Sequence, residues 1–383
     1  MGERYNFYEF FAGGGMARLG LGPRWKCAYA NEWCGKKARS YTANHGQDPI
    51  VDVKDVAKVR PGNLTENAEL AWASFPCQDL SLAGGRKGLV GKRSGTFWPF
   101  WDLMREMDSK NRGVPTIVLE NVVGALSSNN GEDFKVLTEA ISRAGYRFGP
   151  IVMNAVHFVP QSRPRLFIVA CKKDKFLPDS LTGDGPDGFW HTAKVVQAFD
   201  SLSESVKSDW IWWNMPKPKP RNIMLDDIIE KIATSATAHT QEETNRILSM
   251  MSEPNRKKVD AAKGLGKPVV GAVYKRTRKD SHGNKVQRAE VRFDQISGCL
   301  RTPAGGSSRQ ILMIVNGENI RTRLISTREA ARLMGIEDNY QLPSGYNEAY
   351  HLIGDGLAVP VVAWLEANLL HPLASANKLS KVA

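Results

Sequence analysis

The sequence predicts an α/β protein in which strands and helices alternate through the first half, with a more β-rich region in the middle. Three observations support this class. Aromatic residues 4–11 run into a glycine turn and a helical pattern at 12–21, the arrangement of a nucleotide cradle. Two apolar runs, 70–75 and 116–119, are short enough for buried strands. The 383 residues also exceed the usual size of one domain, so we expect two.

The amino-terminal strand and turn are expected to form a ligand cradle. Residues 4–11 are strand-like, and the turn Ala12-Gly13-Gly14-Gly15 follows them directly. Glycine lets the backbone approach a ligand closely, although a glycine turn alone is a weak signal. A dinucleotide fingerprint would need a third glycine at Arg18, so the sequence does not favour a pyrophosphate cofactor.

Acidic residues are expected near the ends of the next two strands. The strand at 26–31 is followed by Glu32-Trp33, and a third strand at 49–53 contains Asp52. An acid after the second strand of a doubly wound fold hydrogen-bonds ribose hydroxyls, and a neighbouring indole can stack on adenine. The alternative is a surface acid beside a packing tryptophan. We expect adenosine-binding groups at successive strand ends, in a βαβ sheet.

A cysteine and a glutamate follow the two buried runs. Cys77 comes after the run 70–75, and Glu120 comes after the run 116–119. Ligands bind at the carboxyl edge of open α/β sheets, so both side chains are expected there. A free cysteine usually only packs, but two reactive side chains at one edge favour chemistry. We expect the glycine-rich stretch 81–95 to close over this edge as a lid; the alternative is a static surface turn.

Positive charge is concentrated in one segment. The formal net charge is +12, and residues 255–310 contain fourteen Lys and Arg against four Asp and Glu, a local excess of +10. This clustering favours a polyanion such as nucleic acid over a merely solvated surface.

Composition argues against several other classes. The five cysteines are odd in number, scattered and without a Cys-x-x-Cys pair, so neither a disulfide framework nor a structural zinc site is expected. The sequence has no run of eighteen apolar residues and no signal-peptide pattern at its start. We expect an intracellular protein with reduced thiols, no bound metal and no membrane segment.

The middle of the chain reads as a smaller domain. The segment 210–220 is predicted to be a proline-broken joint. A helix is expected at 241–251, and strands are expected at 269–274 and 289–293 around a turn at 281–284. The small-residue loop 297–309 is suited to close contact with a nucleic-acid backbone.

Taken in order, these motifs resemble those of the cytosine-5 DNA methyltransferase family. The residues that carry the resemblance are Phe11-x-Gly13-x-Gly15, Asn31-Glu32-Trp33, Asp52, Pro76-Cys77-Gln78, Glu120-Asn121-Val122, Gln161-x-Arg163-x-Arg165, the stretch 323–333 and Gly354-Asp355-Gly356-x-x-Val359-Pro360. The resemblance implies a Rossmann-like catalytic domain that uses S-adenosyl-L-methionine and releases S-adenosyl-L-homocysteine. It also implies an inserted, mostly β target-recognition domain.

The resemblance assigns expected roles to individual residues. Cys77 would be the nucleophile, Glu120 would act on ring nitrogen 3, and Arg163 and Arg165 would face the target base and a nearby phosphate. The residues implied for the cofactor are Phe11, Ala12, Gly13, Gly15, Glu32, Trp33, Asp52, Val53, Pro76, Asp355 and Gly356. The residues expected to contact DNA are Gln78, Ser81, Arg86, Lys87, Gln161, Arg276, Arg278, Arg301 and Arg309.

The same resemblance sets the expected organisation and setting. The catalytic domain would cover residues 1–185 and be completed by 345–383, while 186–344 would form the target-recognition domain and hinge. Because the first motif begins within ten residues of Met1, no amino-terminal regulatory extension is expected. We expect a monomer that acts on double-stranded DNA in a prokaryotic or phage setting, in the cytoplasm at the nucleoid.

Several alternatives stay open at this point. The protein would either belong to a restriction-modification system, with a cognate endonuclease, or act as a solitary methyltransferase. A tRNA cytosine-5 methyltransferase of the same fold is the nearest rival. A DNA-binding protein without catalysis is a rival of another class.

One residue departs from the family pattern. Asp355 stands where the family usually has asparagine. We predict that Asp355→Asn changes methyl-transfer activity by less than about tenfold, because an amide of the same shape restores the usual residue. Steady-state rates of the two proteins test this, and complete loss of activity would assign the acid a special role.

Overall fold

The computed structural model describes residues 4–76, 94–230, 236–280, 282–302 and 309–379, and these form two compact units. Unit 1 comprises residues 1–154, 164–218 and 361–383, and unit 2 comprises 155–163 and 219–360. Unit 1 therefore extends to 218 rather than 185. The segments 155–163 and 345–360, expected in the catalytic domain, group with unit 2. The carboxyl-terminal segment 361–383 groups with unit 1.

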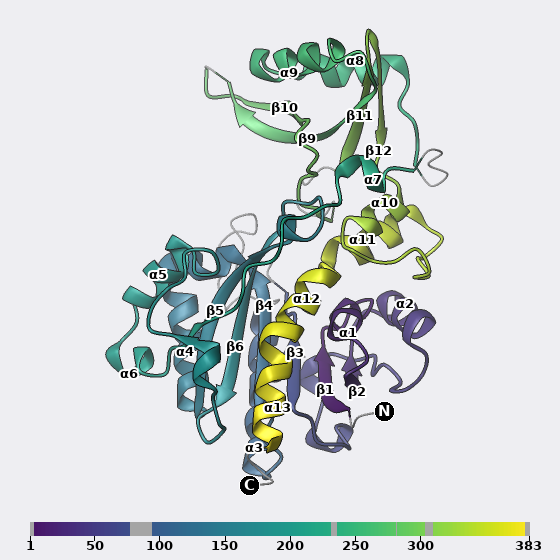
Figure 1. The fold of residues 1–383 in the computed structure, drawn as a ribbon. Coiled ribbons are helices and arrows are strands. Elements are labelled where there is room, and N and C mark those ends of the chain that lie inside the picture. The colour runs from purple at the N-terminus through teal and green to yellow at the C-terminus, as the bar shows by residue number, and fades with distance from the viewer. Residues whose placement is uncertain (1–3, 77–93, 231–235, 281, 303–308, 380–383) are drawn as a thin grey trace. The chain divides into compact units, whose positions relative to one another are not determined.

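A mixed six-stranded sheet forms the centre of unit 1, with the strand order β2-β1-β3-β4-β6-β5 (Figure 1). Its strands are β1 (Tyr5–Phe10), β2 (Trp25–Asn31), β3 (Leu70–Ala73), β4 (Thr116–Val122), β5 (Tyr146–Asn154) and β6 (Pro164–Lys172). The first four are parallel, as expected, whereas β6 runs antiparallel to both β4 and β5.

The strand expected at 49–53 is not formed. Only one bridge, between Asn31 and Asp52, joins this segment to the end of β2. Proline at position 49 lacks a backbone N–H donor, which disfavours a longer ladder. Asp52 nevertheless lies beside the end of β2, as the sequence suggested.

Helices flank this sheet. Those of unit 1 are α1 (Met16–Leu21), α2 (Gly35–His45), α3 (Phe97–Ser109), α4 (Glu132–Arg143), α5 (Ala193–Asp200), α6 (Glu204–Lys207), α12 (Val359–Leu365) and α13 (His371–Leu379). Short 3-10 turns of unit 1 are η1 (Val56–Lys58), η2 (Pro61–Asn63), η4 (Ser94–Thr96), η5 (Val123–Gly131) and η7 (Asp179–Leu181), and the π-helical η8 (Glu366–Leu370) joins α12 to α13. The 3-10 turn η6 (Ala155–His157) belongs to unit 2.

Alternation along the strands divides the core of unit 1. Tyr8 and Phe10 of β1 share one buried cluster with Phe97 and Phe100 of α3. Tyr5 of β1 lies instead against α13, with its ring centroid 5.9 Å from that of His371. The sheet is thus covered on both faces, as expected when parallel strands form its centre.

Residues 209–213, which include three tryptophans, pack and hydrogen-bond along the edge strand β5 or the short strand β7 (Thr182–Gly183). Phe148 of β5 donates its N–H to the Asp209 carbonyl and bridges Trp210, while β8 (Trp212–Trp213) pairs with β7. The segment expected to be only a joint therefore contains a short strand. Burial of its large aromatic side chains holds residues up to 218 in unit 1.

Unit 2 is built on a four-stranded antiparallel sheet with the order β10-β9-β11-β12. Its strands are β9 (Val269–Lys279), β10 (Lys285–Arg292), β11 (Ile311–Asn316) and β12 (Asn319–Leu324), and its helices are α7 (Leu225–Ile228), α8 (Gln241–Ser249), α9 (Glu253–Lys263), α10 (Thr327–Arg332) and α11 (Tyr346–Asp355). Ile247 and Val259 from α8 and α9 share its core with Val273 and Met313. The predicted helix and both predicted strands are confirmed, with β9 and β10 longer than expected.

One helical stretch of the described chain, Tyr346–Leu379, is long and apolar enough to cross a membrane by length and composition. Its most apolar window is 56% buried inside the structure, which is the behaviour of a core helix.

Glu366 provides a test of how the carboxyl-terminal helix is held. Its side chain, 4% exposed, accepts hydrogen bonds from Arg24 Nη2 at 2.6 Å and Trp25 Nε1 at 3.0 Å. Glu366→Ala should lower the free energy of unfolding by about 2 kcal/mol, because it strands a buried indole N–H. Urea unfolding measures this loss. Glu106→Ala, which removes only an exposed pair with Lys110, should cost less than about 0.5 kcal/mol, and equal losses would contradict the prediction.

Candidate active site

The glycine turn after β1 has the backbone of a close-approach cradle. Phe11, Gly13 and Gly15 have φ angles of 57°, 57° and 78°, and the Gly15 N–H closes the turn onto the Ala12 carbonyl at 2.8 Å. A Cβ on Gly13 would meet nothing within 4 Å, whereas one on Gly15 would lie 2.2 Å from His45 Nε2. The turn is therefore open at Gly13 and closed by α2 at Gly15.

Glu32 links this turn to the end of β2. Its side chain is buried; Oε2 accepts the Gly13 N–H at 2.8 Å and Oε1 accepts the Cys34 N–H at 2.8 Å. A carboxylate oxygen has two lone pairs, so both oxygens keep acceptor capacity for a ligand. Glu32 is thus both a support of the turn and a candidate ligand group.

Polar and apolar groups lie side by side at the same strand end. Asp52 accepts a hydrogen bond from the Tyr29 hydroxyl at 2.7 Å and pairs with Lys54 Nζ at 2.9 Å. Trp33 is 75% exposed and Val53 is 51% exposed. Exposed large apolar side chains beside a polar cradle are typical of a site for a planar ligand.

Glu120 and Arg165 meet at the carboxyl edge of the sheet. Glu120 lies near the end of β4, and Arg165 lies near the start of β6, where antiparallel pairing puts it opposite Val122. Arg165 Nε lies 3.2 Å from Glu120 Oε1, and the two side chains are 20% and 10% exposed. Both side chains are mostly buried, which favours a fixed geometry for the pair, and each keeps a small exposed surface.

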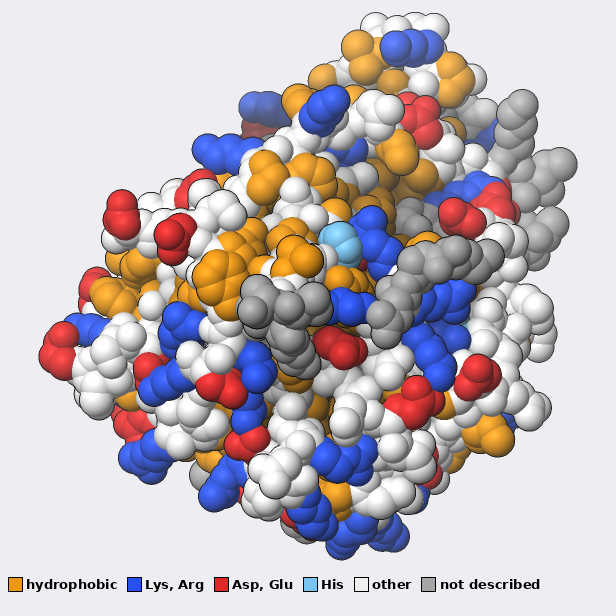
Figure 2. Space-filling view, turned by 60° about the horizontal axis from the view of Figure 1, so that its bottom comes forward, with side chains coloured by type: hydrophobic (Ala, Val, Ile, Leu, Met, Phe, Trp, Pro, Cys, Tyr) orange, Lys and Arg blue, Asp and Glu red, His pale blue; other side chains and the backbone are white. Residues whose placement is uncertain are grey.

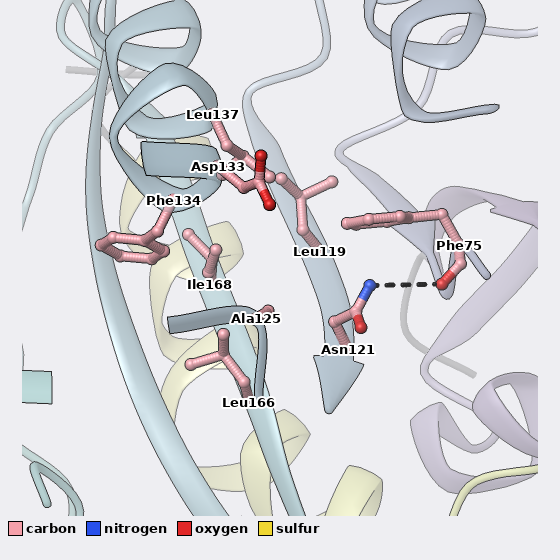
Figure 3. Close-up of a pocket in the computed structure, with 9 residues that line it drawn as sticks. All are labelled: Phe75, Leu119, Asn121, Ala125, Asp133, Phe134, Leu137, Leu166 and Ile168. Atoms are coloured by element: carbon pink, nitrogen blue, oxygen red, sulfur yellow. Dashed lines mark hydrogen bonds between the residues drawn. The ribbon is translucent and has the colours of Figure 1, made fainter. Parts of the chain in front are cut away.

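The segment after β3 is tied to the same strand end. β3 and β4 pair in parallel, with Ala73 opposite Leu119. Asn121 Oδ1 accepts the Val122 N–H. Asn121 Nδ2 donates to the Phe75 carbonyl at 3.3 Å (Figure 3). A small cavity behind this bond is lined mainly by apolar side chains from β4, β6 and α4. It belongs to the core rather than to a polar ligand site.

Some expected residues lie outside the described part of the chain. These are Cys77, Gln78, Ser81, Arg86, Lys87 and nearly all of the expected lid at 81–95. Pro76 is described and directly follows the tethered Phe75. The roles expected for the residues that are not described stay predictions.

Arg163 and Gln161 are interior residues of unit 2, which does not support a direct contact with a base or with DNA. Arg163 is 1% exposed, and its guanidinium donates to the carbonyls of Leu300, Gly354 and Gly356. Gln161 is fully buried and is hydrogen-bonded through Nε2 to the Leu333 carbonyl and through Oε1 to the Leu300 N–H. Burial requires such partners, so both side chains act as internal braces.

The backbone around Asp355 and Gly356 is held by the Arg163 side chain. Asp355 is the exposed last residue of α11, and the carbonyls on either side of it accept from Arg163. The backbone on both sides of Asp355 is thus held within unit 2, and the expected cofactor contact of its side chain stays a prediction.

Of the basic residues expected to contact DNA, Arg276, Arg278 and Arg301 are exposed and Arg309 is partly buried. Arg276 and Arg278 of β9 both pair with Glu290 of β10, and Arg309 lies over the Tyr346 ring. Arg301 is exposed. On the face drawn in Figure 2, Lys and Arg side chains are interspersed with Asp and Glu. Among the described residues no cluster of His, Cys, Asp and Glu could hold a metal ion.

Three residues near the cradle were not singled out from the sequence: Glu9, Tyr41 and His45. Glu9 is buried, and Tyr41 and His45 of α2 contact the turn at Gly15. A signal for Glu9 existed, since it is the one acid in the aromatic strand. The two α2 residues gave no signal, because their role depends on how α2 packs.

An open α/β sheet with a glycine turn, a second-strand acid and a charged pair at its carboxyl edge defines a class of ligand-binding α/β proteins. The family model for the C-5 cytosine-specific DNA methylase matches residues 5–371, and the chain belongs to this family.

Curated type II methyltransferases resemble the chain along most of its length, and two solved structures share its fold. The chain is 24% identical to the type II methyltransferase M.HhaI of Haemophilus parahaemolyticus, covering 95% of this chain and 93% of that protein. It is 24% identical to M.HaeII of Haemophilus aegyptius, covering 98% and 96%. The structures of the S. pombe Dnmt2 methyltransferase and of an E. coli prophage-encoded putative DNA modification methyltransferase share the fold. The Dnmt2 structure has a TM-score of 0.61 at 17% identity and covers 97% of this chain and 99% of its own. The prophage-encoded structure has a TM-score of 0.57 at 15% identity and covers 98% of this chain and 99% of its own.

Gly15 allows the cradle geometry to be tested. Gly15 and Gly46 both have positive φ angles, but only at Gly15 would an added Cβ collide, with His45 and Tyr41. Gly46→Ala should cost about 1 kcal/mol of stability through φ strain alone, and Gly15→Ala should cost at least twice as much. Thermal unfolding measures both. Adding His45→Ala should recover part of the Gly15→Ala loss, and no difference between the two glycine variants would contradict the described packing.

Proposed function

We propose that this protein transfers a methyl group from S-adenosyl-L-methionine to carbon 5 of a flipped-out cytosine in a specific double-stranded DNA sequence. The observation that carries the proposal is the Glu120–Arg165 pair, 3.2 Å apart at the sheet edge, in a chain of the cytosine-5 family. The glycine cradle follows β1, which pairs with β3 and through it neighbours β4.

The cradle fits the proposed cofactor. The open space above Gly13 suits close backbone approach, and Glu32 keeps acceptor capacity for ribose hydroxyls. Exposed Trp33 and Val53 offer apolar surface to an adenine ring, with the Asp52 carboxylate beside them. When bound, S-adenosyl-L-methionine supplies an electrophilic methyl group. Phe11, Ala12 and Pro76 would line the same region.

Carbon 5 of cytosine is too weak a nucleophile to be methylated directly. In the proposed mechanism the Cys77 thiolate adds to carbon 6, and the ring electrons move towards carbon 5. Carbon 5 would then take the methyl group from the bound donor, whose sulfur–methyl bond breaks and which leaves as S-adenosyl-L-homocysteine. A water or hydroxide removes the carbon 5 proton, and the carbon–sulfur bond breaks to release Cys77. A thiolate suits this role because it is a strong nucleophile and a good leaving group.

Glu120 and Arg165 would stabilise charge on the ring during addition. Electron density develops at ring nitrogen 3, where the Glu120 carboxyl would donate a hydrogen bond or a proton. Arg165 donates from a fixed guanidinium and would hold the base oxygen. Their mutual contact orients both side chains before the base arrives.

Attack on the ring face requires an extruded base. Flipping costs a few kcal/mol, which contacts to the DNA must offset. Unit 2 supplies a basic surface for this, with Arg276, Arg278, Arg301 and Arg309 as proposed DNA contacts. Arg163 and Gln161 would act indirectly, by bracing the loops of unit 2.

The proposed setting is a prokaryotic or phage cell, in which the protein acts as a monomer in the cytoplasm at the nucleoid. Bacterial type II methyltransferases among the relatives support the prokaryotic part of this setting, and the restriction-modification and solitary roles both remain open. Bisulfite sequencing of DNA from cells that express the protein would identify the modified cytosine and its sequence context.

Covalent trapping tests the proposed function. Duplex DNA that carries 5-fluorocytosine at the target should form an adduct, because fluorine cannot leave as a proton does. Cys77→Ser should abolish the adduct and lower tritiated methyl transfer by at least about 10³-fold. Glu120→Gln should lower transfer by about 10²–10⁴-fold while DNA binding persists.

The outcomes separate the rival functions. Methylation of tRNA but not duplex DNA would identify the RNA enzyme of the same fold. DNA binding without adduct or transfer would identify a non-catalytic binding protein. Undiminished transfer by Cys77→Ser would overturn the mechanism.

A further inference from the structure

Glu9 is a buried carboxylate beneath the glycine turn, and it is not among the groups that the proposed chemistry uses. It lies one residue before the end of β1 and is 1% exposed. Its Oε1 accepts the Arg18 backbone N–H at 3.3 Å, and its Oε2 accepts the Tyr41 hydroxyl at 2.9 Å. One carboxyl group thereby joins β1 to both α1 and α2.

The same contacts reach the turn itself. α1 starts directly after Gly15, so the Arg18 N–H that Glu9 holds lies in the first turn of that helix. The Tyr41 ring and the His45 ring together fill the space where a Gly15 side chain would stand. Movement of the Tyr41 hydroxyl away from Glu9 would therefore move the wall against which Gly15 packs.

Charged and titratable groups surround Glu9 from each neighbouring element. Arg18 of α1 donates to the Tyr41 hydroxyl through Nη1 and to the Asp48 carbonyl through Nη2. Cys27 of β2 lies 3.5 Å from that hydroxyl, and burial raises the pKa of its thiol to about 12. Burial and then Arg18 lower the pKa of His45 to about 4, so the ring is neutral at pH 7. Glu32 adds negative charge after β2.

These surroundings place the titration of Glu9 near neutral pH. Burial is the largest effect and raises the pKa of Glu9 to about 7, while the hydrogen bond from Tyr41 and the charge of Arg18 oppose it. A proton on the carboxyl would occupy one of the two oxygens that now accept hydrogen bonds from the Arg18 N–H and the Tyr41 hydroxyl. The hydrogen bonds under the turn thus depend on whether Glu9 is ionised.

We propose that Glu9 is a positioning residue whose ionised carboxylate, through Arg18 and Tyr41, holds the glycine turn in its ligand-binding form. Uptake of a proton by Glu9 therefore weakens cofactor binding. The inference rests on the proposed function, since it concerns the site proposed for S-adenosyl-L-methionine.

Acidification should weaken cofactor binding but should raise the contribution of Glu9 to the stability of the fold. Because the folded-state pKa of Glu9 is raised, its contribution to stability is present below its unfolded value of 4.5 and is lost as pH rises through about 7. Replacing Glu9 by neutral glutamine removes this loss at pH 8. If Glu9 served folding alone, its replacement would instead lower both the stability of the protein and its affinity for the cofactor.

Binding of S-adenosyl-L-homocysteine to the full chain, measured by calorimetry between pH 5.5 and 8.5, tests the proposal. Wild-type affinity should fall about tenfold on acidification, with a midpoint near pH 7. Glu9→Gln should bind about tenfold more weakly at pH 8, show no midpoint in this range, and unfold at a temperature no lower than the wild type. Glu106→Gln, at an exposed site on α3, should retain the wild-type profile.

Tyr41→Phe provides the conservative variant. It keeps the ring against Gly15 but removes the hydrogen bond that favours ionised Glu9. The midpoint of the affinity profile should therefore shift to higher pH, which loss of packing alone would not produce. An unshifted midpoint in Tyr41→Phe would overturn the proposal.

The remaining outcomes separate this inference from the proposed function. A flat wild-type profile, an unchanged profile in Glu9→Gln, or joint loss of stability and affinity in Glu9→Gln would overturn only the role of Glu9. Absence of S-adenosyl-L-homocysteine binding by the wild type at every pH would overturn the proposed cofactor and this inference with it.

Discussion

Parallel pairing of β1, β3 and β4 is the constraint on which the rest of unit 1 depends. Phe10 lies opposite Ala73, and Ala73 lies opposite Leu119, so the residues that follow these positions emerge at one edge. A one-residue shift in either pairing would turn the side chains at that edge to the other face. The glycine turn, the tethered segment before Pro76 and the Glu120–Arg165 pair all depend on this register.

Buried carboxylates recur along this edge, and each is given donors. Glu32 accepts two backbone N–H groups, Glu120 pairs with a guanidinium, and Glu9 accepts a hydroxyl and a backbone N–H. Burial of a charge is unfavourable unless such partners compensate it. Buried carboxylates that lie together at one edge of a sheet are candidates for a functional role.

Two arginines two residues apart show how strongly context decides a role. Arg163 is enclosed by carbonyls of unit 2, whereas Arg165 lies near the start of β6 in unit 1 and pairs with Glu120. The boundary between the units falls between them, at Pro164. A motif that contains both thus combines an internal brace with a candidate catalytic group.

The sequence alone determined the alternation of elements, the glycine turn, the acids at 32, 52 and 120, and the family, because strand patterning and short motifs are local properties. It could not predict the antiparallel direction of β6, the burial of Gln161 and Arg163, or the contacts of Glu9 with Arg18 and Tyr41. These depend on pairings between residues that are distant in the chain. Only tertiary packing, through the burial and the donors that it supplies, decides whether a polar side chain supports the fold or faces a ligand.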